Sequence, residues 1–346
     1  MEDAPTAAER ARRRVAQLPA GTFFLGLLFL YLGVALFAPL ASAGPVDLVT
    51  LSWWSQLGVY LLPALALLWG WNLRAGPLLR MRQGLRPAAF AATLLASLAN
   101  FLIGIGLLAL SSALLPDSLP RDYTDRVLGV ETGLRQGLII AAVVFGAPLF
   151  EEISFRGMIQ QPLTARAGPL FGITVTALLF SGLHFDPVGF FPRWELGLFF
   201  GWVVWRTGSL WAGVLAHAVN NGASTLLFLT LSPAAASELE QPTAGHGLAL
   251  VAFGAAFLIP ALYALVKLFP RPGPTQWEAA CQPLDPTLPP GRPALAAALR
   301  PLGFTLAALA LFAGLWLAVV PGPPVEPGAS PDASAGHEAP ARPSRD

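Results

Sequence analysis

The chain has 346 residues, of which 55% are hydrophobic and only 12% are charged. Soluble domains carry about 25% charged residues, so this composition excludes an ordinary soluble protein and favours a membrane protein. The formal net charge of +1 gives no basic surface for nucleic acid, and a single cysteine, Cys281, excludes both a disulfide framework and a cysteine-based metal site.

Long apolar runs predict the fold class. Each run has at least about 17 residues, enough to cross a bilayer, and none shows the alternating pattern of a barrel strand. We therefore predict an all-α, polytopic helical membrane protein of about eight or nine transmembrane helices that form a helix bundle. In chain order, helices are predicted near 20–41, 49–71, 88–115, 136–155, 169–185, 189–205, 209–231, 247–269 and 298–320.

The runs and the loops between them divide the chain into segments. The basic residues of the loops concentrate on the side of the N-terminus, which predicts a multi-pass protein of the cell (inner) membrane with a cytoplasmic N-terminus. Composition predicts a proline-rich linker and a disordered tail near the C-terminus. The predicted segments are 1–19 (cytoplasmic), 20–132 (N-terminal transmembrane helices), 133–231 (core), 232–269 (additional helix), 270–296 (linker), 297–320 (last helix) and 321–346 (tail).

The first apolar run has a second interpretation, as a cleaved signal peptide. Basic residues Arg12 to Arg14 precede it, and Ala41-Ser42-Ala43 resembles a signal-peptidase site. The run has about 20 residues, longer than the apolar region of a typical signal peptide. This length favours an uncleaved first helix.

Three charged residues lie close together in the fourth predicted helix: Glu151, Glu152 and Arg156. Each would cost roughly 2.5–3.5 kcal/mol in the centre of a membrane, so residues of this kind indicate function by default. Glu152 and Arg156 are one helical turn apart and can pair on one face. Glu151 is rotated from them by about 100° and has no local cation.

Two histidines fall within apolar runs, and each has a partner one turn away. His184 follows Phe180 by four residues, and His217 precedes Asn221 by four, with Asn220 as an alternative neighbour. Each residue alone is explained by packing or by an interhelical hydrogen bond. Their recurrence on neighbouring helices, beside an unpaired glutamate, favours one common site.

Together these motifs resemble the CPBP family of intramembrane proteases. That family includes the type II CAAX prenyl endopeptidases and the bacterial Abi-like proteins. The resemblance covers roughly residues 133–231 and implies that this segment is a catalytic, CPBP-like core of the helix bundle; the remaining helices are matched by hydropathy only. The motifs, in chain order, are Glu151-Glu152-x-x-x-Arg156, Phe180-x-x-x-His184 and His217-x-x-x-Asn221.

The resemblance implies an intramembrane endopeptidase that hydrolyses a peptide bond of a membrane-associated peptide or protein. Glu151 would be the general base, and His184 would help to hold the attacking water. His217 and Asn221 would donate hydrogen bonds to the tetrahedral intermediate.

The resemblance implies supporting roles for the remaining motif residues. Glu152 and Arg156 would form a pair that either orients the helix or receives the polar end of the substrate, and Phe180 would support the same site.

A metal ion is the open question for cofactors. Glu151, His184 and His217 supply three ligands, the number that a catalytic zinc site needs. No His-Glu-x-x-His helix is present, and each helix offers a single histidine. The prediction is therefore that no metal is bound and that no cofactor is required, with a divalent metal such as zinc on these three residues as the alternative.

Two functions of other classes are also consistent with buried charges. A proton- or ion-coupled transporter would use embedded Glu, His and Arg residues as a relay, and a non-catalytic scaffold would use the helices for binding alone. The transporter does not explain why His217 is paired with Asn221. The predicted partners are the lipid bilayer and a membrane-associated substrate, and no nucleic acid.

Overall fold

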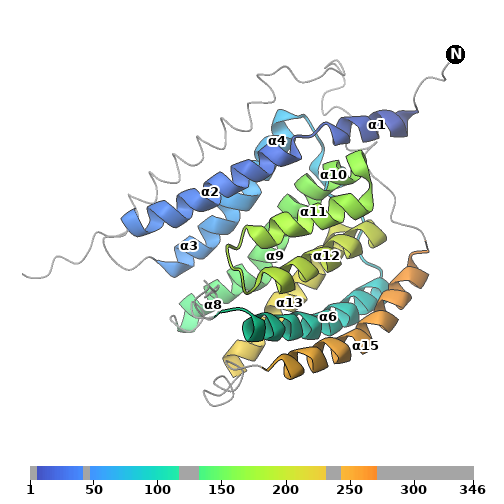
Figure 1. The fold of residues 1–346 in the computed structure, drawn as a ribbon. Coiled ribbons are helices and arrows are strands. Elements are labelled where there is room, and N and C mark those ends of the chain that lie inside the picture. The colour runs from blue at the N-terminus through green and yellow to red at the C-terminus, as the bar shows by residue number, and fades with distance from the viewer. Residues whose placement is uncertain (1–5, 42–46, 117–131, 231–242, 271–346) are drawn as a thin grey trace, which may run out of the picture.

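The computed structural model describes residues 6–41, 47–116, 132–230 and 243–270. Within these residues every regular element is a helix, which confirms the predicted all-α membrane fold. Figure 1 shows a bundle with α2 at one edge, α6 and α15 at the opposite edge, and α9 to α13 between them.

The helices follow the predicted runs, with several divided by π-helical segments. Their bounds are α1 Ala7–Ala16, α2 Ala20–Ala41, α3 Leu48–Trp54, η1 Ser55–Leu61, α4 Leu62–Gly70, α5 Ala75–Leu78, α6 Pro87–Leu114, α8 Gly133–Ala141, η2 Ala142–Gly146, α9 Ala147–Glu152, η3 Ile153–Ile159, α10 Gln160–Ala167, α11 Pro169–Gly182, α12 Phe190–Thr207, α13 Leu210–Thr230 and α15 Ala244–Leu268. A helix thus occupies each predicted run up to residue 269, and the run 298–320 and the tail 321–346 lie outside the described residues, as does the linker from residue 271 on.

Apolar composition marks a subset of these helices as membrane spans. The central helices α12 and α13 are less apolar, because α12 carries Arg193, Glu195 and Arg206 and α13 carries His217 and several other polar residues. The segments long and apolar enough to cross a bilayer, among the described residues, are Ala7–Gly33, Leu48–Gly70, Pro87–Leu114, Gly133–Ala167 and Ala244–Leu268.

The fourth helix is longer than predicted. The sequence placed its end near residue 155, but it continues to Ala167. Hydropathy marks only the end of the apolar run, whereas the helix continues past it because Glu152 and Arg156 pair inside the bundle. The helix ends at Ala167 because Gly168 adopts a φ of +88°, which favours glycine, and Pro169 begins the next helix.

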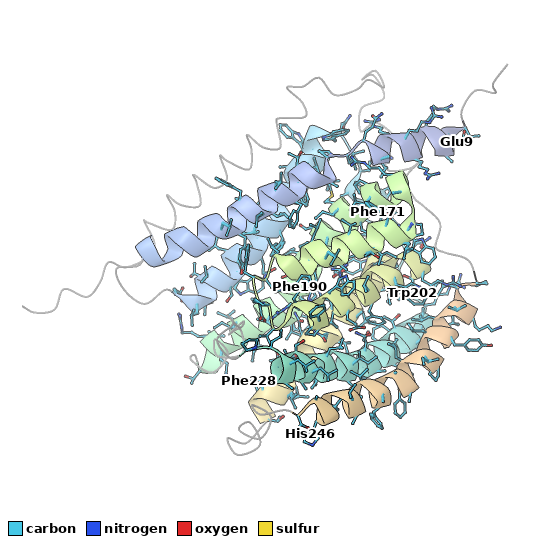
Figure 2. All side chains as sticks on the ribbon, in the orientation of Figure 1. Glu9, Phe171, Phe190, Trp202, Phe228 and His246 are labelled. Atoms are coloured by element: carbon cyan, nitrogen blue, oxygen red, sulfur yellow. The ribbon has the colours of Figure 1, made fainter. Side chains whose placement is uncertain are left out.

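Two π-helical segments enclose the short helix that carries the glutamates. Segment η2 precedes α9 and segment η3 follows it, so Glu151 and Glu152 close a helix of six residues between them. A third π segment, η1, interrupts the helix Leu48–Gly70. Such segments are rare in proteins and concentrate at functional sites, because they rotate the side chains that follow them. Side chains fill the space between these helices (Figure 2).

Candidate active site

Glu152 and Arg156 form a salt bridge inside the bundle. Arg156 Nη1 donates to Glu152 Oε1 at 2.6 Å, and both side chains are fully buried. Arg156 Nη2 donates to the carbonyl oxygen of Gly197 on α12 at 3.1 Å. These contacts tie the helix of the glutamates to α12.

Two aromatic rings lie against the Arg156 guanidinium. Its central carbon is 4.9 Å from the ring centroid of Phe180 and 5.3 Å from that of Phe200. A desolvated cation over an aromatic face is stabilised by about 2 kcal/mol. Phe180 was predicted to support the site. Phe200 on α12 was not, because nothing in its local sequence separates it from the other phenylalanines of an apolar run.

His217 is fixed by the same carboxylate. Its Nδ1 lies 3.1 Å from Glu152 Oε1, the oxygen that also accepts from Arg156. A carboxylate held by an arginine accepts, so Nδ1 carries the hydrogen. The imidazole stacks on Phe200, with 4.9 Å between ring centroids and 20° between planes. The ring position of His217 is therefore set from two sides.

Gly213 makes room for this contact. It lies one turn before His217 on α13, and a Cβ atom there would stand 2.7 Å from Glu152 Oε2 and 2.5 Å from a methyl group of Val204. Neither distance is tolerated by real side chains, so the approach of α13 to Glu152 requires glycine at this position. The sequence signal, a small residue four positions before a candidate histidine, was available and was not used.

Glu151 lies beside His217 on the other side. Its Oε2 is 4.0 Å from His217 Nε2, and the residue is 7% exposed. A further neighbour comes from outside the motifs: the side-chain amide of Gln56, in η1, lies near the Glu151 carboxylate. Sequence reasoning missed Gln56, although it is a polar interruption in the run 49–71.

His184 reaches the site through Phe180. Its Nδ1 is 2.9 Å from the Phe180 carbonyl oxygen, and the Phe180 ring meets the rings of His184 and His217 edge-on, at centroid distances of 5.1 and 5.8 Å. The structure thus brings Glu151, Glu152 and His217 into direct proximity. His184 lies against the aromatic ring that it shares with His217.

The turn after His184 is held by its own contacts. Asp186 Oδ1 accepts the backbone N–H groups of Val188 and Gly189, each at 3.0 Å, and Asp186 Oδ2 pairs with Arg193 at 2.7 Å. Phe185 within this turn has a left-handed φ of +51°. Local hydrogen bonds of this kind stabilise a tight turn, and here they fix the point where α11 ends and α12 begins.

Asn221 makes a contact that the sequence did not predict. Its Nδ2 donates to the carbonyl oxygen of Val143 at 2.9 Å, in the π segment η2. Its Oδ1 accepts from Asn220 at 3.4 Å. Asn221 therefore joins α13 to the helix of the glutamates, one turn from His217.

The two remaining histidines are not part of the described site. His246 is exposed at the start of α15, away from the site (Figure 2), and His337 lies outside the described residues. No three His, Cys, Asp or Glu side chains among the described residues are grouped so that they could hold a metal ion. Glu151, His184 and His217 are accordingly not such a group in the described part of the chain.

Comparison with known proteins identifies the segment that carries the site. Residues 134–223 match the family described as Type II CAAX prenyl endopeptidase Rce1-like. No curated protein and no solved structure matches the chain. The matched segment runs from α8 into α13 and contains every residue that the three motifs contributed. The match over this segment supports the resemblance to the type II CAAX prenyl endopeptidases that the motifs predicted.

Proposed function

We propose that the protein is an intramembrane endopeptidase that cleaves a membrane-associated peptide or protein by means of a water activated by Glu151 and His184. The observation that carries this proposal is the placement of a buried carboxylate 4.0 Å from His217 Nε2, within the segment that matches a peptidase family. Intramembrane hydrolysis of CAAX-type substrates is the coarse activity of that family.

The reaction requires a base and a later proton donor. Glu151 takes a proton from the attacking water as the water oxygen bonds to the scissile carbonyl carbon. The tetrahedral intermediate then expels the amine, and Glu151 returns the proton to the leaving nitrogen. His184 contributes a second contact to the water. One carboxyl group thus serves both half-reactions, and no proton is lost to the surrounding lipid.

The tautomer of His217 dictates how it stabilises the oxyanion. Because Nδ1–H is engaged by Glu152, Nε2 of a neutral ring holds a lone pair and cannot donate. His217 therefore donates to the oxyanion as a doubly protonated imidazolium, and Glu152 is its counter-ion. Asn221 supplies the second donor with the amide group that also holds Val143.

Arg156 completes the charge balance of this arrangement. Its guanidinium neutralises Glu152 when His217 is neutral, and the surrounding rings of Phe180 and Phe200 keep water away from the pair. We place Arg156 as a positioning residue, because its donors bond to its own chain and the side chain is fully buried.

Orientation in the membrane follows from the ends of the helices. Arg12 and Arg14 of α1 donate to the carbonyl oxygens of Ala165 and Trp71, at 3.1 and 3.4 Å, so the ends of α10 and α4 meet α1 at one end of the bundle (Figure 1). Basic residues gather there, which supports a cytoplasmic N-terminus in the cell membrane.

The test is cleavage by the purified protein in liposomes. The probe is a prenylated peptide with a CAAX carboxyl terminus, and mass spectrometry reports the new peptide ends. We expect Glu151→Gln to lower the rate at least about 1000-fold, because the neutral amide takes no proton. The matched control is Glu195→Gln, which removes another intramembrane carboxylate, one that accepts from Asn100 at 3.2 Å on the far side of α12.

Two outcomes would contradict the proposal. Full cleavage by Glu151→Gln removes the base from the mechanism. An equal loss in the Glu195→Gln control, with both proteins folded, shows that the effect does not belong to Glu151.

A further inference from the structure

The residue that follows His184 has an unfavourable backbone conformation. Phe185 has a left-handed φ of +51°, in the turn after the end of α11. Glycine usually takes this conformation at the end of a helix, because it has no Cβ atom to clash with the backbone. The other non-glycine residues with a left-handed φ in the described part of the chain are Asn72 and Arg80. A bulky aromatic residue in this conformation is strained, and such strain concentrates at functional sites.

The turn does not need the Phe185 ring for its own structure. Asp186 accepts two backbone N–H groups within the turn, each at 3.0 Å, and Ser181 Oγ donates to the Phe190 carbonyl oxygen at 2.6 Å. Glycine in place of Phe185 would allow the same turn without strain. The Phe185 side chain is also half-exposed, so it adds little to the apolar core. Its presence is therefore explained by a contact outside the turn.

That contact is with helix α2. The rings of Phe185 and Tyr31 are stacked, with 5.7 Å between their centroids and 21° between their planes. Helix α2 lies at one edge of the bundle, outside the segment that matches the peptidase family, and it packs against η1, η3 and α4 through its own apolar residues (Figure 1). The stack therefore adds a direct tie between α2 and the residue next to His184.

The contacts of His184 with α11 hold the imidazole from one side. Because a carbonyl oxygen only accepts, His184 Nδ1 donates to the Phe180 carbonyl oxygen, at 2.9 Å. The Phe180 ring also meets the imidazole edge-on, at 5.1 Å between centroids. Both contacts set the imidazole relative to the last turn of α11. The backbone on the other side of His184 is set by the left-handed conformation of Phe185 and by the stack on Tyr31.

We propose that Phe185 and Tyr31 are positioning residues of the peptidase, whose stacked rings hold the backbone of His184 where its imidazole meets the attacking water. This inference rests on the proposed function, in which His184 contacts that water. An aromatic pair stabilises a contact beyond the area that it buries, and its preferred geometry is specific. Through this pair, α2 acts on the site without supplying a group to the chemistry.

Three substitutions of Phe185 separate the ring from the turn. Phe185→Gly removes the ring and the strain, so the unfolding temperature in detergent should stay the same or rise. Phe185→Leu keeps the strain and removes the stack. In both, kcat for the prenylated CAAX peptide should fall at least about 10-fold, because a misplaced group near the reacting atoms is costly. Phe185→Tyr keeps the ring and should keep kcat. KM should stay unchanged, because the stack acts through His184 and not on the substrate.

Two matched controls test the backbone and the ring separately. Asn72 has the same φ of +51° and follows α4, at the end of the bundle that α1 contacts. Asn72→Gly therefore changes a left-handed turn in the same way as Phe185→Gly. Phe253 and Phe257 of α15 form another aromatic pair, 5.0 Å between centroids, and Phe253→Leu removes it. Both controls should retain kcat, since neither residue adjoins His184.

Two double variants test whether the effect passes through His184. Tyr31→Leu should lower kcat as much as Phe185→Leu, and the two together should lower it no further, since each removes the same stack. In a His184→Ala background, Phe185→Leu should leave the residual rate unchanged, because the residue that it positions is gone.

The outcomes that would overturn the proposal differ from those that would overturn the proposed function. A wild-type kcat in Phe185→Gly and Phe185→Leu, with His184→Ala impaired, removes the positioning role and leaves the peptidase intact. A rise in KM alone, or an equal loss of kcat in either control, overturns the role as well. A wild-type kcat in His184→Ala contradicts the proposed function itself.

Discussion

Two regions of this bundle solve the same problem, helix association in a membrane, by opposite means. Between α6 and α15, glycines let the backbones touch: a Cβ atom at Gly106 would stand 2.7 Å from the Gly247 carbonyl oxygen, and one at Gly254 would stand 2.9 Å from the Ala99 carbonyl oxygen. Between α9, α12 and α13, a carboxylate, a guanidinium and an imidazole form the contact instead.

The difference teaches what each contact is for. Close approach of small residues gives dispersion and weak backbone interactions without any buried charge, which is the usual way in which membrane helices associate. A buried salt bridge gives back little more than the cost of its desolvation, so it is a poor means of holding helices together. The polar contact is therefore explained by a role in the reaction, and the glycine contact by a role in helix packing.

The largest expected effect comes from breaking the salt bridge. Arg156→Leu leaves Glu152 buried without its cation, which should lower the free energy of unfolding by about 3–5 kcal/mol. Thermal unfolding of the purified protein in detergent measures this loss. Cleavage should fall as well, since Arg156 no longer holds the Glu152 carboxylate to which His217 is bonded.

A double variant sharpens the same comparison. Replacement of both partners, as Glu152→Met with Arg156→Leu, should restore most of the lost stability, because an apolar pair of similar volume needs no compensation. Activity should not return. If cleavage returned with stability, the pair would be architectural in the same sense as the glycines of α6 and α15.

A smaller effect is expected from adding one methyl group at the polar contact or at the glycine contact. Gly213→Ala pushes a Cβ atom against Glu152, and Gly106→Ala pushes one against the α15 backbone. Both should cost about 1–3 kcal/mol of stability. Only Gly213→Ala should lower kcat of the folded protein, because it displaces the carboxylate that holds His217. Equal kcat values in the two variants would show that the position of Glu152 does not matter to the reaction.

Contacts within one helical turn were predictable from the sequence. The spacing of Glu152 and Arg156 predicted their pairing, and the structure confirms it at 2.6 Å. The spacing of Phe180 and His184 likewise predicted their shared face, and their rings are in contact. Helical periodicity suffices for such pairs, since neighbours at i and i+4 are determined without any tertiary structure.

Contacts between helices were not predictable in the same way. The bond from His217 to Glu152 joins residues 65 positions apart, and the stacking of His217 on Phe200 depends on how α12 and α13 pack. The π segments around α9 decide which way the glutamates point, yet no pattern of hydropathy marks them. Gln56 was missed for this reason: it is a neighbour of Glu151 only because η1 lies beside α9.

One local signal was present and was not used. Within the predicted segment 1–19, Thr6 and Glu9 form a capping box, in which each side chain bonds the other's backbone N–H, and α1 begins directly after Thr6. A Thr followed three residues later by Glu is a recognised start of a helix. The sequence therefore held enough information for α1, and hydropathy alone concealed it because the helix is rich in arginine.

The smallest effect on stability is expected from an exposed ion pair at the edge of the bundle. Asp47, directly before α3, accepts hydrogen bonds from the Thr50 hydroxyl and from Arg135 of α8. Partial burial acts to raise the pKa of Asp47, but the Thr50 hydrogen bond and the Arg135 guanidinium outweigh it and hold the pKa below its ordinary value. The two side chains are 35% and 51% exposed, so water screens the pair strongly.

The sign of the pH dependence follows from that lowered pKa. A carboxyl group with a lowered folded-state pKa contributes stability above its ordinary pKa of about 3.9, and this contribution is lost as the pH falls through the lowered value. Asp47→Asn should therefore lower the unfolding temperature slightly at neutral pH, and the difference from wild type should shrink in acid, with no change in kcat at neutral pH. A loss of stability as large as that of Arg156→Leu would mean that an exposed ion pair holds these helices as strongly as a buried one. Burial would then not explain why the Glu152–Arg156 pair and the Asp47–Arg135 pair differ.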